Sequence, residues 1–197
     1  MRRWRIPAAA PNYLSKLLRA DERGQAILEF AITLPLLVVF IVGIYDFSGA
    51  FNEKQKIEQA AQEGAIIAGA QPTSDMEPVA NSNPNSLRPI VTAVVNSLIA
   101  SGVVTTSCTP PGTVTGGANL TWTYTISGCP GNLIITINRG WSAGAGTADS
   151  PSVSGTVVKI QYPYIWKFNS VIQLLIPGAN YNLPTTLTES ATVHNQM

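Results

Sequence analysis

The chain has 197 residues, of which only 12% are charged, and its formal net charge is +1. This length allows one membrane segment and one domain of modest size, and the charged fraction is about half the usual share. Six of the twelve basic residues precede Gly24, whereas from Gln25 onward nine acidic residues outnumber six basic ones. A mildly acidic body argues against a nucleic-acid-binding protein, and the basic cluster follows the rule that positive charges flank the cytoplasmic end of a membrane segment.

The apolar segment Phe30–Tyr45 contains no charged residue and spans about 24 Å as an α-helix. Residues Gln25–Leu28 extend it towards the roughly 30 Å of a bilayer core, provided that Glu29 is neutralised, snorkels or pairs. We therefore expect a transmembrane helix, with the N-terminus in the cytoplasm and the residues after Asp46 outside. A cleaved secretory signal is the alternative, although its apolar region is shorter and lies nearer the N-terminus.

Two residues, Glu29 and Pro35, are unusual in a membrane helix. A carboxylate such as Glu29 costs on the order of 2–3 kcal/mol when it is inserted into a membrane, so a partner is expected. Pro35 is tolerated in a membrane helix and predicts a kink there.

The helix is expected to continue beyond the membrane. Residues Asp46–Ala70 contain no proline and become amphipathic, and Pro72 ends the pattern because the residue before a proline avoids the α region. One helix over Gln25–Ala70 would be about 68 Å long. Its Ala- and Gly-rich part, Ala60–Ala70, offers a thin face that packs on the chain's own sheet, on a neighbouring helix, or on both.

The remaining residues predict an α+β domain over residues 89–197. Residues 1–24 are read as a basic cytoplasmic leader and residues 71–88 as a linker. Pro89 suits the first turn of a helix over Pro89–Ala100, and Gly102 suits its end. The domain is expected to hold one or two helices packed on an antiparallel sheet of about four strands.

Alternation of apolar and polar residues predicts these strands. A hairpin is expected from Leu120–Ile126 and Leu133–Ile137, joined by the turn at residues 128–131. A long strand over Val153–Phe168 has Pro163 near its end. A short helix at Val171–Ile176 and a last strand at Leu187–Val193 complete the domain.

Cys108 and Cys129 are the only cysteines of the chain. A structural metal site normally needs four ligands, and the single histidine, His194, is far away in the sequence. Two cysteines outside the cytoplasm most often form a disulfide, which would contribute roughly 2–4 kcal/mol of stability. We expect a Cys108–Cys129 disulfide and no metal.

Candidate catalytic groups are few. His194 lies three residues from the C-terminus, where an exposed tail is the simpler interpretation. Asp149 and Glu189 could form a glycosidase pair, but nothing in the sequence places them together. Gly116-Gly117 lacks the lysine and helix of a phosphate-binding loop. The sequence thus predicts no enzyme and no cofactor.

Three tryptophans lie in the β-rich part: Trp122, Trp141 and Trp166. They could form a sugar-binding face, but core packing is the commoner use of such residues.

The segment GQAILEFAITLPLL, residues 24–37, resembles the start of TadE-like proteins, which are minor pseudopilins of the Tad/Flp tight-adherence pilus system. The resemblance continues through Gly43–Asp46 and Ala60–Ala70. It implies a pilin-like fold and a structural role in pilus assembly and adhesion. The long region after Ala70 is similar to a minor subunit rather than to the short major pilin.

The resemblance also implies specific roles. A prepilin peptidase would cut after Gly24 and leave Gln25 as the new N-terminus. Glu29, followed by Phe30, would then pair with the free amine of a neighbouring subunit and set the axial register, since paired charges in a low-dielectric bundle offset each other's desolvation. Gln25 is polar where many pilins have an apolar residue, and the leader is long. In a chain that is never cleaved, Glu29 would need another partner.

The implied partners are the prepilin peptidase, other pilin or pseudopilin subunits, inner-membrane assembly proteins and the lipid bilayer, with no nucleic acid. The implied location is the bacterial inner membrane, with the domain outside the cytoplasm. Two other hypotheses stay open: a membrane-anchored adhesin or glycan-binding module outside any filament, and a periplasmic enzyme on a signal anchor.

Overall fold

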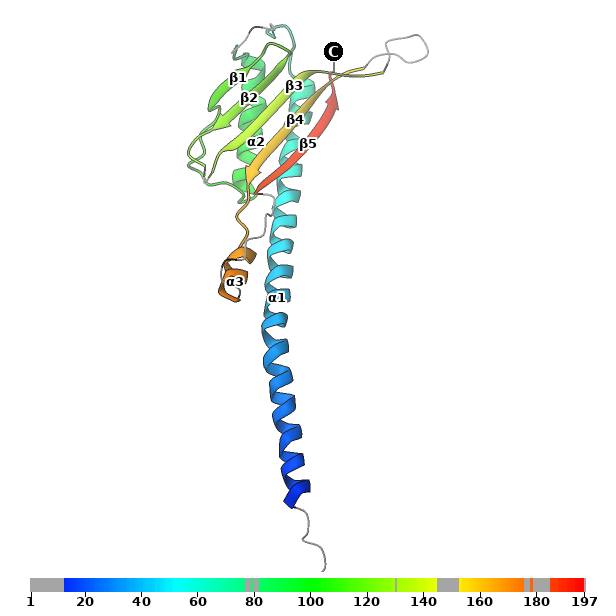
Figure 1. Cartoon of the computed structure of the whole chain (residues 1–197). Helices are drawn as coiled ribbons and strands as arrows, with labels where there is room; N and C mark the ends of the chain where they lie inside the picture. The colour runs from blue at the N-terminus through cyan, green and yellow to red at the C-terminus, as the bar shows by residue number, and fades with distance from the viewer. Residues whose placement is uncertain are drawn as a thin grey trace, which may run out of the picture. The chain divides into compact units, whose positions relative to one another are not determined.

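The computed structural model describes residues 13–76, 79, 82–129, 131–144, 153–175, 178 and 185–196. The chain divides into two compact units, of which the first comprises residues 1–45 and 167–180, and the second comprises residues 46–166 and 181–197. The elements (Figure 1) are α1 (Tyr13–Ala70), the 3-10 turn η1 (Asn85–Leu87), α2 (Arg88–Ala100), β1 (Thr113–Gly116), β2 (Thr121–Ile126), β3 (Leu133–Ala143), β4 (Val153–Pro163), α3 (Phe168–Leu175) and β5 (Thr186–His194).

Helix α1 has 58 residues and ends at Ala70, as the sequence predicted. It begins at Tyr13, so the helix also includes residues that precede the expected start at Gln25. The helix continues through Pro35 without interruption. Its part from Gly24 to Ala70 is long and apolar enough to cross a membrane.

The second unit contains one antiparallel sheet with the strand order β1-β2-β3-β4-β5, so each strand pairs with its neighbour in the sequence. The sequence predicted about four strands, and β1 is the one that it missed. Thr113 of β1 lies opposite Thr125, and Gly116 opposite Trp122. This segment has only four residues and a single large apolar side chain, that of Val114, so it shows no alternating strand pattern.

Strand β4 ends at Pro163, opposite Thr186, and not at Phe168 as the sequence analysis expected. Phe168 instead begins α3, which overlaps the short helix expected at Val171–Ile176. The sequence analysis extended the strand through the apolar and aromatic residues after Pro163. A short apolar run has no clear period, so a strand and a helix cannot be told apart there. Ile176 lies outside the described residues.

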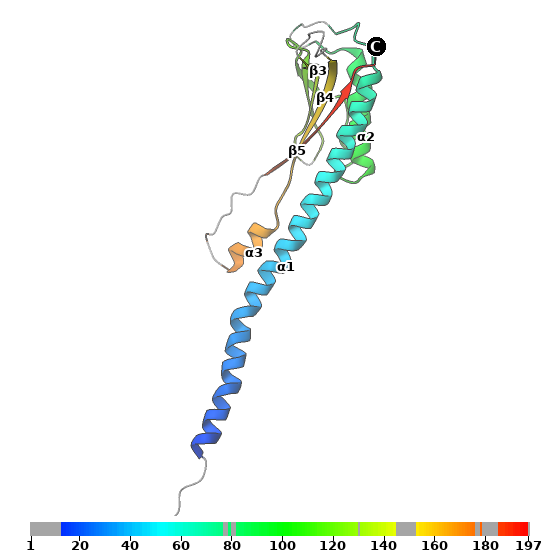
Figure 2. The ribbon, with the colours of Figure 1, turned by 90° about the vertical axis from the view of Figure 1, so that its right-hand side faces the viewer.

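Helix α2 and the second unit's part of α1 lie on the same side of the sheet (Figure 2). Alternate residues of β2, β3 and β4 point towards these helices and are buried, whereas the residues between them are partly exposed. The largest fully buried side chains include Trp122, Tyr124, Ile135, Ile137 and Ile160 from the sheet and Ile57, Ile90 and Leu98 from the helices.

The Ala-rich face of α1 packs inside this unit, as predicted for the chain's own sheet. Ala61, Ala65 and Ala68 are buried, and a Cβ on Gly64 would overlap the Cγ2 atom of Val94 in α2. Small residues let the two helices approach so closely that only hydrogen fits at position 64. The helix pair therefore depends on glycine for its spacing.

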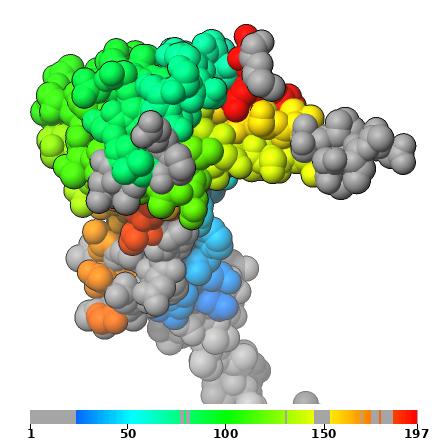
Figure 3. Space-filling model, turned by 90° about the horizontal axis from the view of Figure 1, so that it is seen from above, coloured from blue at the N-terminus to red at the C-terminus, as the bar shows by residue number. Residues whose placement is uncertain are grey.

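The C-terminal end of α1 is held by the sheet. Arg139, a buried residue of β3, donates hydrogen bonds to the carbonyl oxygens of Ala68 and Gln71, the latter at 3.0 Å. The amide of Gln196 donates to the Gly69 carbonyl at 3.0 Å, and Figure 3 shows the red end of the chain beside the blue-green end of the helix. One arginine and one backbone amide thus donate to three carbonyl groups at the end of the helix, where carbonyl groups lack helical partners.

Candidate functional site

The apolar segment of α1 presents large side chains that the first unit does not cover. Ile27, Phe30 and Ile44 are 71%, 64% and 70% exposed. A contiguous apolar surface of this size in water would be unfavourable, and it marks a site for lipid or for other helices. The residues from Gln25 to Tyr45 can therefore act as a membrane anchor, which agrees with the sequence prediction.

Glu29 lies on this exposed surface, and its side chain forms no ion pair with any residue from 24 onward whose side chain the structure describes. Thr33 donates a hydrogen bond through Oγ1 to the Glu29 carbonyl oxygen at 3.0 Å. This hydroxyl is a second donor to that carbonyl oxygen, besides the backbone amide of Thr33 in the helix. The carboxylate itself stays open to a partner from another molecule.

Gly24 and Gln25, the predicted cleavage position, are exposed within α1. A Cβ on Gly24 would meet no atom within 4 Å. Its backbone is helical, whereas a protease commonly needs an extended chain. The helical conformation at Gly24 would have to open locally for cleavage.

An aromatic cluster surrounds residues Asp46 and Phe47 in the second unit. The rings of Phe47 and Trp166 lie 5.2 Å apart between centroids, and those of Tyr164 and Trp166 lie 4.9 Å apart, both edge to face. The Tyr164 hydroxyl is 3.2 Å from the Asp46 carbonyl oxygen and 3.3 Å from its Oδ1 atom. Asp46 is buried. Sequence reasoning missed this cluster, because its two halves lie more than a hundred residues apart.

The disulfide between Cys108 and Cys129 is present, as predicted, with the two Cα atoms 4.8 Å apart. It joins the loop before β1 to the turn between β2 and β3. Ser107 supports the same connection, because its hydroxyl donates to the Gly128 carbonyl at 2.7 Å.

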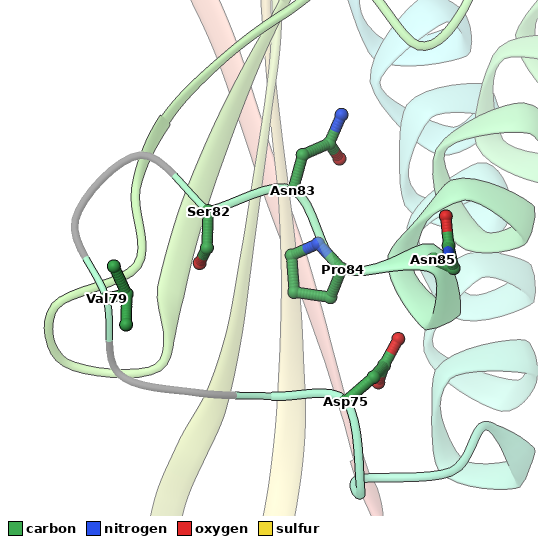
Figure 4. Close-up of a pocket in the computed structure, with 6 residues that line it drawn as sticks. All are labelled: Asp75, Val79, Ser82, Asn83, Pro84 and Asn85. Atoms are coloured by element: carbon green, nitrogen blue, oxygen red, sulfur yellow. The ribbon is translucent and has the colours of Figure 1, made fainter.

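Residues between α1 and α2 form an open surface pocket of about 340 Å³, lined by Asp75, Val79, Ser82, Asn83, Pro84 and Asn85 (Figure 4). The amide of Ser86 donates to Asp75 Oδ2 at 2.9 Å. Desolvation raises the pKa of Asp75, but the hydrogen bonds from Ser86 and Asn85 outweigh it and leave the pKa below its ordinary value. Among the described residues that line the pocket, Asp75 is the only one with a charged side chain.

The same loop is tied to the core by two aromatic side chains. Trp122 donates from Nε1 to Ser82 Oγ at 3.1 Å, and the Tyr124 hydroxyl donates to Asn83 Oδ1 at 3.1 Å. Burial raises the pKa of Tyr124 to about 12, with Arg88 lowering it and Asp75 raising it further. The loop is thereby fixed to the sheet.

The tryptophans do not form one face. Trp122 is fully buried in the core, as the commoner interpretation predicted, and Trp166 packs with Phe47. Trp141 lies beside Gly155 on the neighbouring strand, where a Cβ would be 2.8 Å from the indole. A single exposed sugar-binding surface made of all three is excluded, because the indole of Trp122 is out of reach.

Three candidate catalytic groups remain. Glu189 forms an ion pair with Lys54 at 3.0 Å, and Asp149 lies outside the described residues. His194 is exposed at the end of β5. Among the residues that the structure describes, no three His, Cys, Asp or Glu side chains gather to hold a metal ion.

Residues 24–65 match the family model described as "TadE: TadE-like protein", which agrees with the resemblance seen in the sequence. The match covers the exposed apolar segment, Glu29 and the first part of the helix face that packs in the second unit. No curated protein and no solved structure matches the chain.

Proposed function

We propose that this chain, whose residues 24–65 match the TadE-like family, is a membrane-anchored minor pseudopilin that takes part in assembly of a Tad/Flp-type pilus. Its role is structural rather than catalytic. One observation carries the proposal: the family match falls on a helix that exposes large apolar side chains between Ile27 and Tyr45. The exposed carboxylate of Glu29 lies among them.

The anchor has a simple physical basis. An apolar helix with exposed side chains is stable in a bilayer or among similar helices, and not in water. Six basic residues precede Gly24, so the N-terminus belongs in the cytoplasm and the second unit outside it. The Cys108–Cys129 disulfide supports an extracytoplasmic location, where disulfides persist.

Glu29 supplies the assembly contact in this proposal. A prepilin peptidase cuts after Gly24, and the new ammonium group of Gln25 on one subunit pairs with Glu29 on another pilin or pseudopilin subunit. Each group offsets the desolvation of the other in the membrane, and loss of one leaves the other unpaired. Such a pair sets the axial position of the subunit.

The test is replacement of Glu29 by Ala or Gln in the native host. We expect the protein to remain in the membrane at its normal level while pilus assembly is lost. Glu63→Ala is the matched control, since Glu63 is an exposed glutamate on the same helix outside the apolar segment. Normal pilus numbers with Glu29→Ala would refute the role of the carboxylate.

Processing is tested separately by intact mass and N-terminal sequencing of the protein from its native membrane. We expect a mature chain that begins at Gln25. A chain that begins at Met1 would contradict cleavage and leave a permanently anchored envelope protein. A chain that begins near Ala50 or beyond would show that the apolar segment is a signal peptide.

A further inference from the structure

Helix α3 contacts the apolar segment of α1 within the first unit. A Cβ on Gly43 would be 3.3 Å from the Cε2 atom of Phe168, and Figures 1 and 2 both show α3 alongside α1. Gly43 is buried and lies in the last turn of the segment Phe30–Tyr45. Phe168 therefore lies at the depth of this last turn along α1.

The two faces of α3 differ in polarity. Phe168 and Ile172 are four residues apart and share one face, and Ile172 is only 6% exposed. Ser170 and Gln173 are exposed, and Val171 is partly exposed. The apolar face is therefore covered within the protein, and the face left outward is polar but carries no charge, so it can lie among lipid headgroups.

The connection that contains α3 is long and carries a single charge. It spans the 22 residues between the end of β4 at Pro163 and the start of β5 at Thr186. Lys167 is the only charged residue between Gln161 and Glu189.

The residues next to α3 in the sequence are those of a membrane–water interface. Tyr164 and Trp166 precede Lys167, and the last residue of the apolar segment is Tyr45, which is 70% exposed. Aromatic residues are enriched at the level of the headgroups, and lysine extends its amine to water there.

We propose that α3 inserts into the interfacial region of the phospholipid leaflet on the side of the domain, as a second membrane contact besides α1. The proposal rests on the membrane anchoring of α1 that the proposed function includes. Its partner is the lipid itself, at the boundary between headgroups and acyl chains. Such a contact would hold the connection between β4 and β5 at the bilayer surface.

The experiment uses fluorescent labels on single cysteines of the full chain. Both natural cysteines are in the disulfide, so each introduced thiol is the only free one. Val171→Cys and Gln173→Cys report on α3, Leu37→Cys on the apolar segment, and Asn96→Cys on an exposed position of α2. Each protein carries an NBD label in phosphatidylcholine vesicles at a high lipid-to-protein ratio, without any other protein.

Three quenchers locate each label. Nitroxide lipids labelled at carbon 5 report shallow depth, those labelled at carbon 12 report the middle of the leaflet, and aqueous iodide reports water. We expect loss of Val171→Cys and Gln173→Cys fluorescence mainly with the carbon-5 lipid, of Leu37→Cys mainly with the carbon-12 lipid, and of Asn96→Cys with iodide alone. An unchanged urea midpoint shows that each variant is folded.

The two proposals fail in distinguishable ways. Iodide quenching of both α3 labels, with Leu37→Cys still quenched by lipid, would overturn the insertion of α3 and leave the anchor intact. Labels on α3 that neither lipid nor iodide reaches would show burial against protein and would also overturn it. Iodide quenching of Leu37→Cys would overturn the membrane anchor itself.

Discussion

Replacement of Gly64 by alanine tests the close packing of α1 on α2. Alanine gains about 1 kcal/mol over glycine in a helix interior. The new Cβ, however, would overlap Val94 Cγ2, and Val94 is fully buried and stiff about its first side-chain torsion. Overpacking costs about 1–3 kcal/mol, so we expect Gly64→Ala to lower the free energy of unfolding by about 1 kcal/mol.

The same substitution should have the opposite sign once Val94 is shortened. Val94→Ala removes two methyl-sized groups, worth about 0.8 kcal/mol each, and adds a cavity term, for a loss of about 2 kcal/mol. In that background the Cβ of residue 64 enters vacant space and only the helix propensity remains. Gly64→Ala should then raise stability by about 1 kcal/mol, a coupling of about 2 kcal/mol.

The assay is urea unfolding of the full chain in mild detergent, followed by far-UV circular dichroism and by tryptophan fluorescence, to which the buried Trp122 contributes. Wild type, the two single variants and the double variant complete the cycle, and Gln62→Ala, an exposed neighbour on α1, is the control. Additive effects, within about 0.5 kcal/mol, would refute the reasoning that position 64 is limited by Val94.

Two further predictions concern the polar groups of the core. Arg139→Met keeps the aliphatic bulk but removes the donor of the Gln71 carbonyl oxygen and leaves the Ala68 carbonyl oxygen with only the Gln71 amide. It should lower the free energy of unfolding by about 1–3 kcal/mol, measured by urea unfolding; no loss would show that water replaces the guanidinium. The pKa of Tyr124 is raised to about 12 from an ordinary 10, so the folded state holds its proton longer than the unfolded state, and stability should fall between about pH 10 and 12. Tyr124→Phe, which also loses the bond to Asn83, should show a smaller fall over that range, and parallel pH profiles of the two proteins would contradict this assignment.

The long helix, its end at Ala70 and the apolar segment were predictable because they depend on local composition and period. The same holds for α2 and for the hairpin of β2 and β3, in which neighbouring strands follow each other along the chain. The disulfide followed from the number of cysteines. Residues 24–37 carried the family resemblance, because Glu29 and Pro35 are unusual within an apolar helix.

Contacts between distant parts of the chain could be found only in the tertiary structure. The interaction of Arg139 with the end of α1 joins positions about seventy residues apart, and the sequence shows an isolated arginine within a strand. Gly43 reads as an ordinary small residue of a membrane helix until Phe168 is placed against it. β1 could not be predicted, since four residues with a single large apolar side chain become a strand only when β2 supplies their hydrogen bonds. Local patterns specify elements, but which residues meet depends on the packing of those elements, and this packing places α3 beside the apolar segment of α1.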